Sequence, residues 1–418
     1  YALIRVYFDF LGGQFPWWWG FTILLVGTLS ALLGVMYALM EHDLKRLLAF
    51  HSVENIGIIL MGIGAGMIFQ TYGLTEFAAL GLLAALYHTI NHALFKALLF
   101  LGAGSLLYAT HTRNMEEYGG LLKRMPWTGL FFLIGAVSIS ALPPTNGFVS
   151  EWLLFQTLFL SVQLPALFLK LMLPIAAAIL ALTGVLALVC FAKAFGISFL
   201  ALPRSTHARQ AEEVPIAMRI GMGILTLLCV GLGLAPMIVV PLLDRIIGPL
   251  TGVSISDKVL ALDGWALAPV NMEFSSLSTP VLAAMLIVGG LLGLLLAFLF
   301  GGRLMTRSYK TWGCGINISA RTEYTATGFA QPIKRVFSTI YQPTVTLETE
   351  FLEESRYFAK HRRFELHIEP TFEKYLYDPV VRVFLGIADR LRILQAGSLH
   401  LYLTYIFVTL VILLLFAV

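Results

Sequence analysis

Charged side chains are scarce in this sequence. Asp, Glu, Lys and Arg together make up 12% of its 418 residues, whereas hydrophobic residues make up 58%. A soluble domain carries about 25% charged residues, so this composition excludes an ordinary soluble protein. Long apolar segments without charge are typical of helices that cross a bilayer. We therefore expect an all-α, multi-pass membrane protein whose helices pack against one another and against lipid.

The sequence also lacks the motifs of redox and nucleotide chemistry. Its three cysteines, Cys190, Cys229 and Cys314, lie far apart, and no CxxC pair is present for a metal ion or an iron–sulfur cluster. Cys314, between two glycines, could be a ligand, but a lone cysteine is weak evidence for a metal site. There is no phosphate-binding loop and no glycine pattern of a dinucleotide site. We expect no cofactor and no metal in this chain, and no nucleic-acid partner.

What is present is a series of apolar segments, each near the roughly 20 residues that a membrane span requires. The expected spans are Phe21–Met40, Val53–Gln70, Ala78–Leu107, an interrupted element Trp127–Gln163, Leu173–Leu200, Val214–Pro236, Thr279–Phe300 and Gly397–Val418. Met237–Leu250 is expected to continue the preceding span or to lie at the interface, because it carries Asp244 and Arg245. Tyr1–Leu11 resembles the end of a helix, so we expect the sequence to be the C-terminal part of a longer protein.

Basic residues are distributed unevenly over the connections between these spans. Most of them lie in Glu41–Ser52, Thr110–Pro126, Ala201–Glu213 and Gly302–Ala396. The intervening connections hold only Lys170, Arg245 and Lys258. By the positive-inside rule, the basic connections are expected in the cytoplasm.

Three protonatable residues stand out in the segment Leu74–Thr110. His88, His92 and Lys96 are spaced by four residues, so on a helix they form one column on one face. A charged group at bilayer depth costs about 3 kcal/mol on insertion scales, so such groups face protein or water. The column therefore predicts a proton path. The competing interpretation is that these side chains only make hydrogen bonds between packed helices.

The element Trp127–Gln163 is interrupted by the sequence LPPTNG at residues 142–147. The prolines remove backbone donors and Asn-Gly favours a turn, so one discontinuous helix is expected. Discontinuous helices mark ion and substrate sites in transporters. Glu151 follows the break, where the helix N-terminus and burial act in opposite directions and so suit a group that changes protonation. The alternative is an ordinary glutamate in the first turn of a helix.

Two further ionisable residues lie in apolar runs. The second helical element is expected to open at Asp43, a plausible N-cap. Within it, Glu54 is followed by an unbroken apolar stretch, which favours a buried role, and His51 and Asn55 flank it. For His51 a polar collar at the interface is an equal alternative. Lys193 lies within LALVCFAKAFGISFL, near enough to the inner end for its side chain to reach water, so functional and structural roles are both open.

The sequence changes character after the seventh of these spans. We expect a transmembrane bundle at residues 1–302, a cytoplasmic-face segment at 303–396 and a terminal anchor at 397–418. Two amphipathic stretches, expected to be mostly helical, lie along the membrane surface. The first contains Leu347 and Phe351, and the second has apolar residues at helical spacing from Phe372 to Leu394. Asp378-Pro379 is expected to separate two helices, because α geometry is disfavoured before proline.

Three stretches resemble a known family: DLKRLLAFHSVENIG at residues 43–57, HTINHALFKALLFLGAGS at 88–105 and SALPPTNGFVSEWLL at 140–154. They are similar to the antiporter-like, proton-translocating subunits of respiratory complex I, Mrp antiporters and membrane-bound hydrogenases. HSVENIG, the segment TWGCG…ARTEYTATGF and the terminal span are most similar to the large membrane subunit of formate hydrogenlyase and hydrogenase-4 type complexes.

The resemblance implies repeated five-helix units in inverted orientation, each with one broken helix, joined by a central polar axis. It assigns Lys45 to a lysine motif where a loop enters a helix, and Glu151 to the terminal charged position, where several relatives have lysine. The glutamate–lysine pair of the family's first repeat is absent here. No catalytic residue is expected. The expected translocation residues are Lys45, Glu54, His88, His92, Lys96, Glu151 and Lys193.

The sequence therefore predicts an inner-membrane subunit that moves protons or sodium ions within a larger oxidoreductase. Its partners would be the lipid bilayer and the other membrane and peripheral subunits, which would carry out the redox chemistry. Two alternatives stay open: an Mrp-type cation/proton antiporter subunit, and a structural scaffold with inert polar residues. The long C-terminal surface segment favours a complex-bound subunit, and ionisable residues in successive helices disfavour a scaffold.

Overall fold

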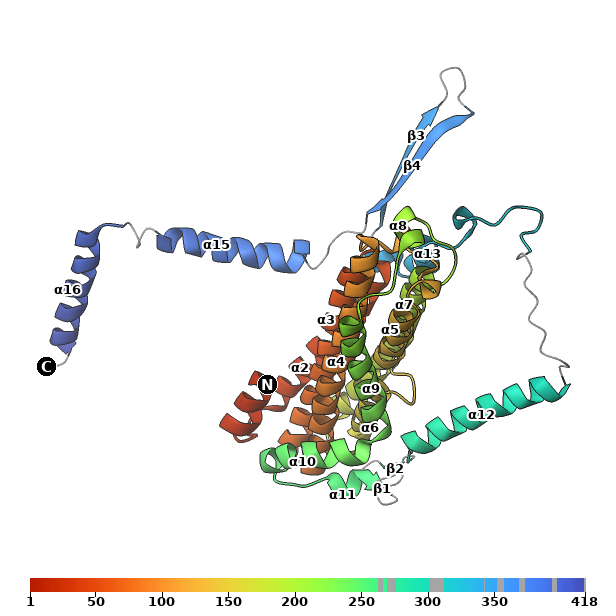
Figure 1. Cartoon of the computed structure of the whole chain (residues 1–418). Coiled ribbons are helices and arrows are strands. Elements are labelled where there is room, and N and C mark those ends of the chain that lie inside the picture. The colour runs from red at the N-terminus through yellow and green to blue at the C-terminus, as the bar shows by residue number, and fades with distance from the viewer. Residues whose placement is uncertain are drawn as a thin grey trace. The chain divides into compact units, whose positions relative to one another are not determined.

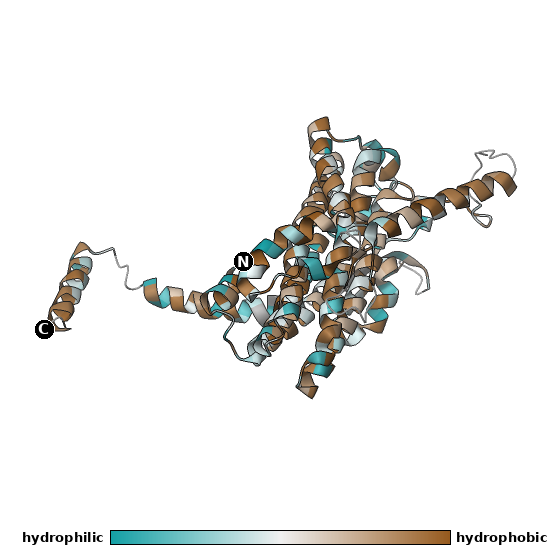
Figure 2. Ribbon diagram, turned by 90° about the horizontal axis from the view of Figure 1, so that it is seen from below, coloured by the Kyte–Doolittle hydropathy of each residue, from teal (hydrophilic) through white to brown (hydrophobic). Residues whose placement is uncertain are grey.

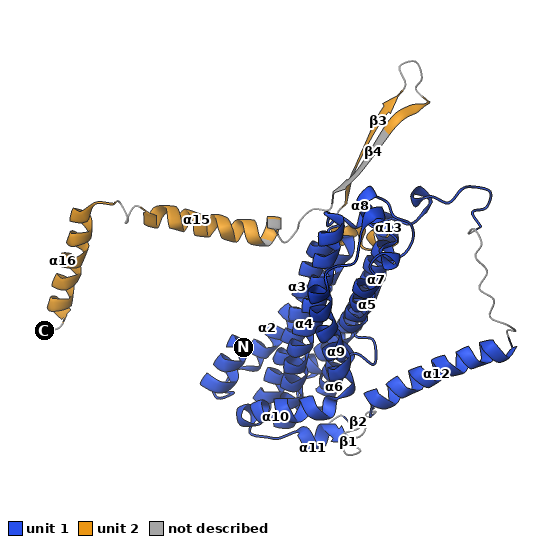
Figure 3. Ribbon diagram, in the orientation of Figure 1, with its two compact units in different colours: residues 1–331 blue, residues 332–418 orange. Residues whose placement is uncertain are grey.

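The computed structural model describes residues 1–261, 266–268, 276–300, 312–341, 343–351, 357–367, 373–392 and 397–416. The described chain is mainly helical, with two short antiparallel strand pairs. It divides into two compact units, residues 1–331 and 332–418 (Figure 3). The domain boundaries expected at 302/303 and 396/397 involve residues outside the described ranges, so these boundaries stay predictions.

Seven helices among the described residues are long and apolar enough to cross a membrane. They are α2 (Trp17–Met40), α3 (Leu44–Thr71), α4 (Thr75–Thr110), α7 (Leu167–Phe199), α9 (Ile216–Leu234), α12 (Thr279–Phe300) and α16 (Leu399–Phe416). The expected all-α, multi-pass membrane fold is confirmed. The helix start predicted at Asp43 is confirmed, because the Asp43 carboxylate accepts the backbone N–H groups of Lys45 and Arg46 and so caps α3 at Leu44.

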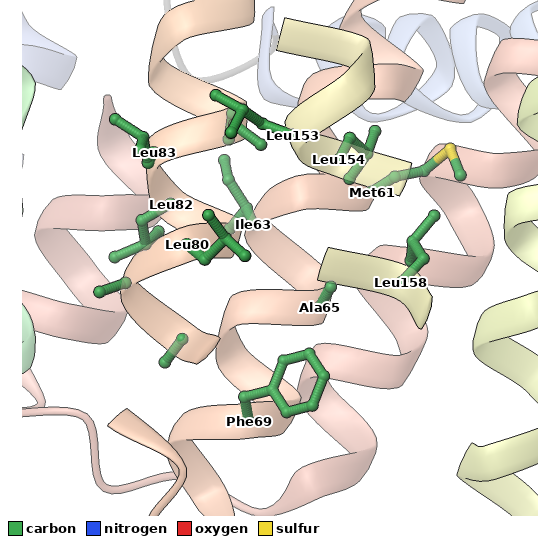
Figure 4. Close-up of a cluster of buried hydrophobic side chains, with 14 of the residues drawn as sticks. Met61, Ile63, Ala65, Phe69, Leu80, Leu82, Leu83, Leu153, Leu154 and Leu158 are labelled. Carbon is green, nitrogen blue, oxygen red and sulfur yellow. The ribbon is translucent and has the colours of Figure 1, made fainter. Parts of the chain in front are cut away.

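Close helix packing forms the core of the first unit, in which α2, α3, α4, α5, α7 and α9 run side by side (Figure 1). A Cβ atom on Gly57 of α3 would lie 2.5 Å from the Gly27 carbonyl oxygen of α2. A Cβ on Gly34 would lie 2.6 Å from the Glu54 nitrogen. Small residues at such contacts are typical of membrane helices. Apolar side chains of α3, α4 and the neighbouring α6 fill the interior (Figure 4), and hydrophobic residues dominate the helices overall (Figure 2).

The interrupted element consists of two half-helices, α5 (Pro126–Ile139) and α6 (Asn146–Phe159). The expected break is confirmed, and it contains a cis Pro143–Pro144 peptide. The halves meet directly, because a Cβ on Gly147 would lie 2.0 Å from the Ser138 carbonyl oxygen. Asn146, the first residue of α6, is fully buried. The break thus places a helix N-terminus inside the bundle.

The basic connections meet at one end of the bundle, here called the basic end. It contains η2 (Met115–Glu117), η3 (Leu121–Lys123), α8 (Thr206–Gln210), η5 (Ala320–Thr322) and the first residues of α13 (Ala326–Val336). Asp43 forms a β-bridge with Asn114, and Arg204 donates hydrogen bonds to the carbonyls of Ile197 and Tyr324. These contacts place connections that are far apart in sequence side by side.

The opposite end of the bundle holds the shorter elements of the first unit. They are α1 (Ala2–Ile4), η1 (Arg5–Phe10), η4 (Leu160–Gln163), α10 (Pro236–Thr251), α11 (Ser256–Val259), β1 (Leu260–Ala261) and β2 (Ala266–Leu267). Lys258 of α11 forms an ion pair with Glu76 of α4. The residues expected to continue the preceding span or lie at the interface form α10, a separate helix that crosses this end (Figure 1).

The second unit corrects one prediction. Leu347 and Phe351 lie on β3 (Thr344–Phe351), which pairs antiparallel with β4 (Ala359–His367), whereas a helix was expected. In TVTLETEF the apolar residues Val345, Leu347 and Phe351 lie at odd-numbered positions between polar ones, and this period of two favours a strand. The pairing partner of Leu347 is Phe364, which helical spacing does not reveal.

The remaining described elements of this unit are helical. They are α14 (Ser338–Tyr341), η6 (Glu373–Tyr377), α15 (Asp378–Arg392) and α16. The helix boundary predicted at Asp378-Pro379 is confirmed, because η6 ends at Tyr377 and α15 begins at Asp378. Phe372 and Leu394 lie outside the described residues, and the placement of α15 along a membrane surface stays a prediction.

Candidate functional site

The column predicted on α4 lies in the interior of the bundle. His88 is 2% exposed and Lys96 is 5% exposed, whereas His92 is only partly buried. Its Nε2 atom is nevertheless buried and has no hydrogen-bond partner among the described residues. The three residues share a helix face as expected, but each has a different environment.

A second group of polar residues lies on α3. His51 and Glu54 form a buried pair through Nδ1 and Oε2, and both side chains are at most 2% exposed. Asn55 Nδ2 donates to the His51 carbonyl oxygen at 2.7 Å and to Glu54 Oε2 at 3.3 Å. These bonds fix the Asn55 amide, so that its Oδ1 atom points away from Glu54.

His88 joins α3 to the broken helix. Its Nε2 atom lies 3.1 Å from Asn55 Oδ1 and its Nδ1 atom 3.0 Å from the Ser150 hydroxyl of α6. Asn91 Nδ2 donates to the same hydroxyl at 2.9 Å and to the Asn146 carbonyl oxygen at 2.7 Å. The result is a continuous set of hydrogen bonds across three helices, here called the polar network. Its members are His51, Glu54, Asn55, His88, Asn91 and Ser150.

The partners of His88 allow two arrangements of hydrogen. Asn55 Oδ1 only accepts, so His88 Nε2 must donate. Ser150 lies 3.1 Å from the Gly147 carbonyl oxygen and has a single hydroxyl hydrogen. If that hydrogen goes to Gly147, His88 Nδ1 also donates and the imidazole is protonated. If the hydroxyl turns to His88 Nδ1, the imidazole is neutral. One hydroxyl rotation therefore accompanies the gain or loss of one proton.

Lys96 and Glu151 lie beside this network. The Lys96 ammonium donates to the Leu48 carbonyl oxygen of α3, and its charge interacts with Glu54. Glu151 is 7% exposed, and a Cβ on Gly184 of α7 would lie 3.9 Å from its Oε2 atom. It interacts electrostatically with Glu54, although no hydrogen-bond partner of its carboxylate is found among the described residues.

Lys193 of α7 occupies a different position, at the end of α2. Its ammonium donates to the carbonyl oxygens of Leu39 at 2.6 Å and of Glu41 at 2.9 Å. The side chain is 1% exposed, so it does not reach water directly. A cation at this place satisfies the last carbonyls of α2 and its negative dipole end. Lys193 therefore has at least a structural role.

Some predictions gain no contact with the network. Lys45 is partly exposed in the first turn of α3, and among the described residues no hydrogen bond joins its ammonium to the network. Cys314 is exposed. No cluster of three or more potential metal-ligating side chains occurs in the part of the chain that the structure describes.

Four residues of the network are not among the expected translocation residues. From the sequence, His51 and Asn55 are singled out only as neighbours of Glu54, whereas Asn91 and Ser150 are not assigned to the site. Ser150 is a single small polar residue in the first turns of α6, and Asn91 lies within the column of charged residues. Neutral residues carry no insertion penalty comparable with that of a charge, so composition does not mark them. Both lie next to or within the motifs HTINH and FVSEW, which is the signal that was available.

Comparison with known proteins supports the same assignment of fold. Residues 1–179 match the family described as NADH:quinone oxidoreductase/Mrp antiporter, TM. The chain is 38% identical over 416 residues to hydrogenase-4 component B of Escherichia coli K12, covering 99% of this chain and 61% of that protein. It is 39% identical over 332 residues to formate hydrogenlyase subunit 3 of the same organism, covering 79% of this chain and 52% of that protein. The chain thus spans between half and two thirds of the length of these relatives.

Two solved structures share the fold. A chain of the membrane-bound sulfane sulfur reductase, an archaeal respiratory membrane complex, matches with a TM-score of 0.64 and 25% identity, covering 94% of this chain and 56% of that chain. A chain of the Mrp complex from Dietzia sp. matches with a TM-score of 0.51 and 21% identity, covering 62% of this chain and 52% of that chain. The antiporter-like bundle predicted from the sequence is therefore confirmed.

Proposed function

We propose that this chain is an antiporter-like membrane subunit of the NADH:quinone oxidoreductase/Mrp antiporter type and that it moves protons through its polar network. The observation that carries the proposal is the continuous hydrogen bonding from the His51–Glu54 pair to Ser150 of the broken helix. A structural scaffold needs no such connection among ionisable groups of successive helices.

The network supplies groups that hold a proton and groups that pass it on. His88 takes up or releases a proton at Nδ1 while the Ser150 hydroxyl rotates. Glu54 carries a second exchangeable position, shared with His51. Because the interior has a low dielectric constant, a change of charge at Glu54 is felt strongly by Lys96 and Glu151. Proton movement along the network is thus coupled to charge on α4 and α6.

The residue types favour protons over sodium ions. Hard cations prefer several oxygen ligands around one point, whereas the network alternates imidazole, amide, hydroxyl and carboxylate groups, and Lys96 adds a positive charge. Imidazole nitrogens change protonation near neutral pH when unperturbed. We assign protons as the transported ion, with sodium transport as the alternative that the experiment separates.

The relatives suggest the setting in which this happens. Hydrogenase-4 component B and formate hydrogenlyase subunit 3 are named as parts of enzymes, and the sulfane sulfur reductase is a respiratory membrane complex. We propose that this chain likewise works as a subunit of a membrane oxidoreductase, with redox chemistry in its partners. Its basic end would face the cytoplasm across the inner membrane.

The test uses the complete complex in inverted membrane vesicles, with its subunits identified by mass spectrometry after purification. Electron transfer would drive ion uptake, followed by a pH-sensitive dye and, in parallel, by radioactive sodium. Glu54→Gln should abolish dye-detected uptake while the complex stays assembled. Glu212→Gln, at an exposed position of the basic end, is the matched control and should behave like wild type. Equal proton uptake by both variants would refute the proposal. Sodium uptake in place of proton uptake would show that sodium, and not the proton, is the transported ion.

A further inference from the structure

A second polar cluster lies at the basic end, away from the polar network. We call it the His42 cluster, and it consists of His42 between α2 and α3, Glu116 of η2 and Thr327 of α13. The backbone nitrogen and the hydroxyl of Thr327 donate to Glu116 Oε1 at 2.8 and 2.7 Å. His42 Nε2 lies 2.8 Å from the Thr327 hydroxyl oxygen and 3.8 Å from Glu116 Oε1.

The donor and the acceptor of each hydrogen bond in this cluster follow from the groups involved. The only hydroxyl hydrogen of Thr327 is donated to Glu116, so the hydroxyl oxygen accepts from His42 Nε2–H. The cluster is therefore a short chain of hydrogen bonds in which the His42 imidazole donates to the Thr327 hydroxyl and this hydroxyl donates to the Glu116 carboxylate. The side chains of His42 and Glu116 are 37% and 24% exposed. Water thus reaches both ends of a chain that can pass a proton.

Lys193 lies between this cluster and the polar network. Its ammonium binds the carbonyl oxygen of Glu41, the residue before His42, and interacts electrostatically with both His42 and Glu116. On the same helix, the Phe191 ring packs against the His51 ring at a tilt of 37°, with centroids 4.7 Å apart. Lys193 also interacts electrostatically with His51. Lys193 is therefore a buried charge that interacts electrostatically both with His51 of the network and with His42 and Glu116 of the His42 cluster.

The charges around His42 suit a group that accepts protons. Burial and the Lys193 ammonium lower the pKa of His42, and the Glu116 carboxylate opposes this shift. The imidazole is thus neutral near neutral pH and free to bind a proton at its second nitrogen. The two charges that act on His42 are therefore Lys193 of α7 and Glu116 of η2. The third neighbouring element, α13, contributes the uncharged Thr327.

We infer that His42, with Thr327 and Glu116, is the site at which protons are exchanged between the polar network and the water at the basic end. Lys193 is the buried relay between the two. This inference rests on the proposed function, because it names an access point to the same network. It gives Lys193 a role beyond capping α2.

The same geometry explains a sequence segment that had no assigned role, ARTEYTATGF at residues 320–329. Glu323 accepts the backbone N–H of Leu202 at 2.9 Å, and the Tyr324 carbonyl accepts from Arg204 at 3.1 Å. These bonds hold the segment on the basic end and bring Thr327 to His42. The segment thus supplies the hydroxyl that completes the exchange site.

The experiment measures redox-driven proton uptake in vesicles that contain the whole complex. His42→Ala should lower uptake by about tenfold or more, because a positioned proton-transfer group contributes at least that much. Added imidazole should restore uptake, because the site is open to water, and restoration should vary with the pKa of substituted imidazoles. His207→Ala, at an exposed histidine of α8, is the matched control and should resemble wild type. His42→Gln keeps a hydrogen-bond donor for Thr327 but cannot carry a proton, so it should lose uptake even though it folds.

The outcomes separate the inference from the proposed function. If Lys96→Ala abolishes uptake while His42→Ala and His42→Gln retain it, the network conducts protons but the exchange site lies elsewhere. If His42→Ala loses uptake and no imidazole restores it, His42 has only a structural role and the inference is wrong. If Glu54→Gln, the variant that tests the proposed function, retains full uptake, the proposed function itself fails.

Discussion

The helices α3 and α12 are both apolar enough to span a membrane, yet they differ in what they carry. In the most apolar stretch of α3, 72% is buried inside the structure, whereas in the corresponding stretch of α12 only 6% is buried. The buried helix contains His51, Glu54 and Asn55, and the exposed helix contains no Asp, Glu, Lys or Arg. The apolar helix α16 likewise has no charged residue of these types.

The difference follows from the cost of desolvation. A polar side chain in the membrane needs a partner, because an unpaired one costs several kcal/mol. In α3 the neighbouring helices supply partners such as His88, while the largely exposed α12 has few side chains around it that could pair with a charge. Ionisable residues are therefore concentrated where the bundle connects them. We interpret the bundle as the ion path, and α12 and α16 as lipid-facing or attachment helices.

The largest effect is expected from Lys96→Ala. This change removes the ammonium that binds Leu48 and interacts with Glu54, so coupled translocation should fall by about 100-fold, as for a lost acid–base group. The complex should still assemble. Lys123→Ala, at an exposed lysine of the basic end, is the control. Dye-detected proton uptake would measure the effect. Normal uptake by Lys96→Ala would show that the Lys96 ammonium is not required for translocation.

A smaller but still large effect is expected at Gly233 of α9. A Cβ there would lie 2.3 Å from the Pro144 carbonyl oxygen and 2.5 Å from the carbonyl carbon of Thr145. Gly233→Ala should therefore displace the break and Ser150 with it, at a cost of about 1–3 kcal/mol from overpacking. Gly231→Ala, on the same helix, meets no atom within 4 Å and should be silent. Thermal unfolding of the purified complex and proton uptake should both separate the two variants, and equal behaviour would mean that the break tolerates displacement.

Ser150→Ala should have a moderate effect. It removes the hydroxyl between His88 and Asn91, and a water molecule can replace part of its function, so uptake should fall by about tenfold. Ser105→Ala is the control, because the Ser105 hydroxyl lies outside the network and bonds to the Leu101 carbonyl of its own helix and to the sulfur of Met222. Rates of uptake at several pH values would test whether the step through His88 has become limiting. A pH profile identical to that of the control would exclude Ser150 from the path.

The smallest effect on translocation per assembled complex is expected from deletion of Gly397–Val418. This segment contains α16 and has no Asp, Glu, Lys or Arg. Its loss should therefore weaken assembly of the complex and leave the polar network intact. Native gel electrophoresis would report the yield of complex, and uptake normalised to that yield would report conduction. Normal assembly combined with a specific loss of uptake would overturn the interpretation of α16 as an attachment.

Much of the fold was predictable from the sequence, because its signals are local. Apolar length gave the spans, the two prolines at residues 143 and 144 gave the broken helix, and Asp43 marked the start of α3. The pairing of β3 with β4 was missed, because it depends on residues far along the chain. Leu347 and Phe351 are spaced by four residues, which helical spacing and this strand both accommodate.

The candidate site was predictable only where it is charged. Lys96 and Glu54 are conspicuous in apolar surroundings, and the structure places them close enough to interact. Whether they take part in translocation stays a prediction. The link through Ser150 was not predictable, because the sequence does not reveal how the break orients α6 against α4. The position of Lys193 was equally hidden, since its partners are backbone carbonyls at the end of α2.

The most direct test of proton movement through the network is uptake by His88→Asn. Asparagine retains donors and acceptors for Asn55 and Ser150, but it cannot take up a proton. The complex should assemble and transfer electrons, and the number of protons taken up per electron pair should fall below the wild-type value. An unchanged number of protons per electron pair would contradict conduction through His88 and, with it, the path from α3 to the broken helix.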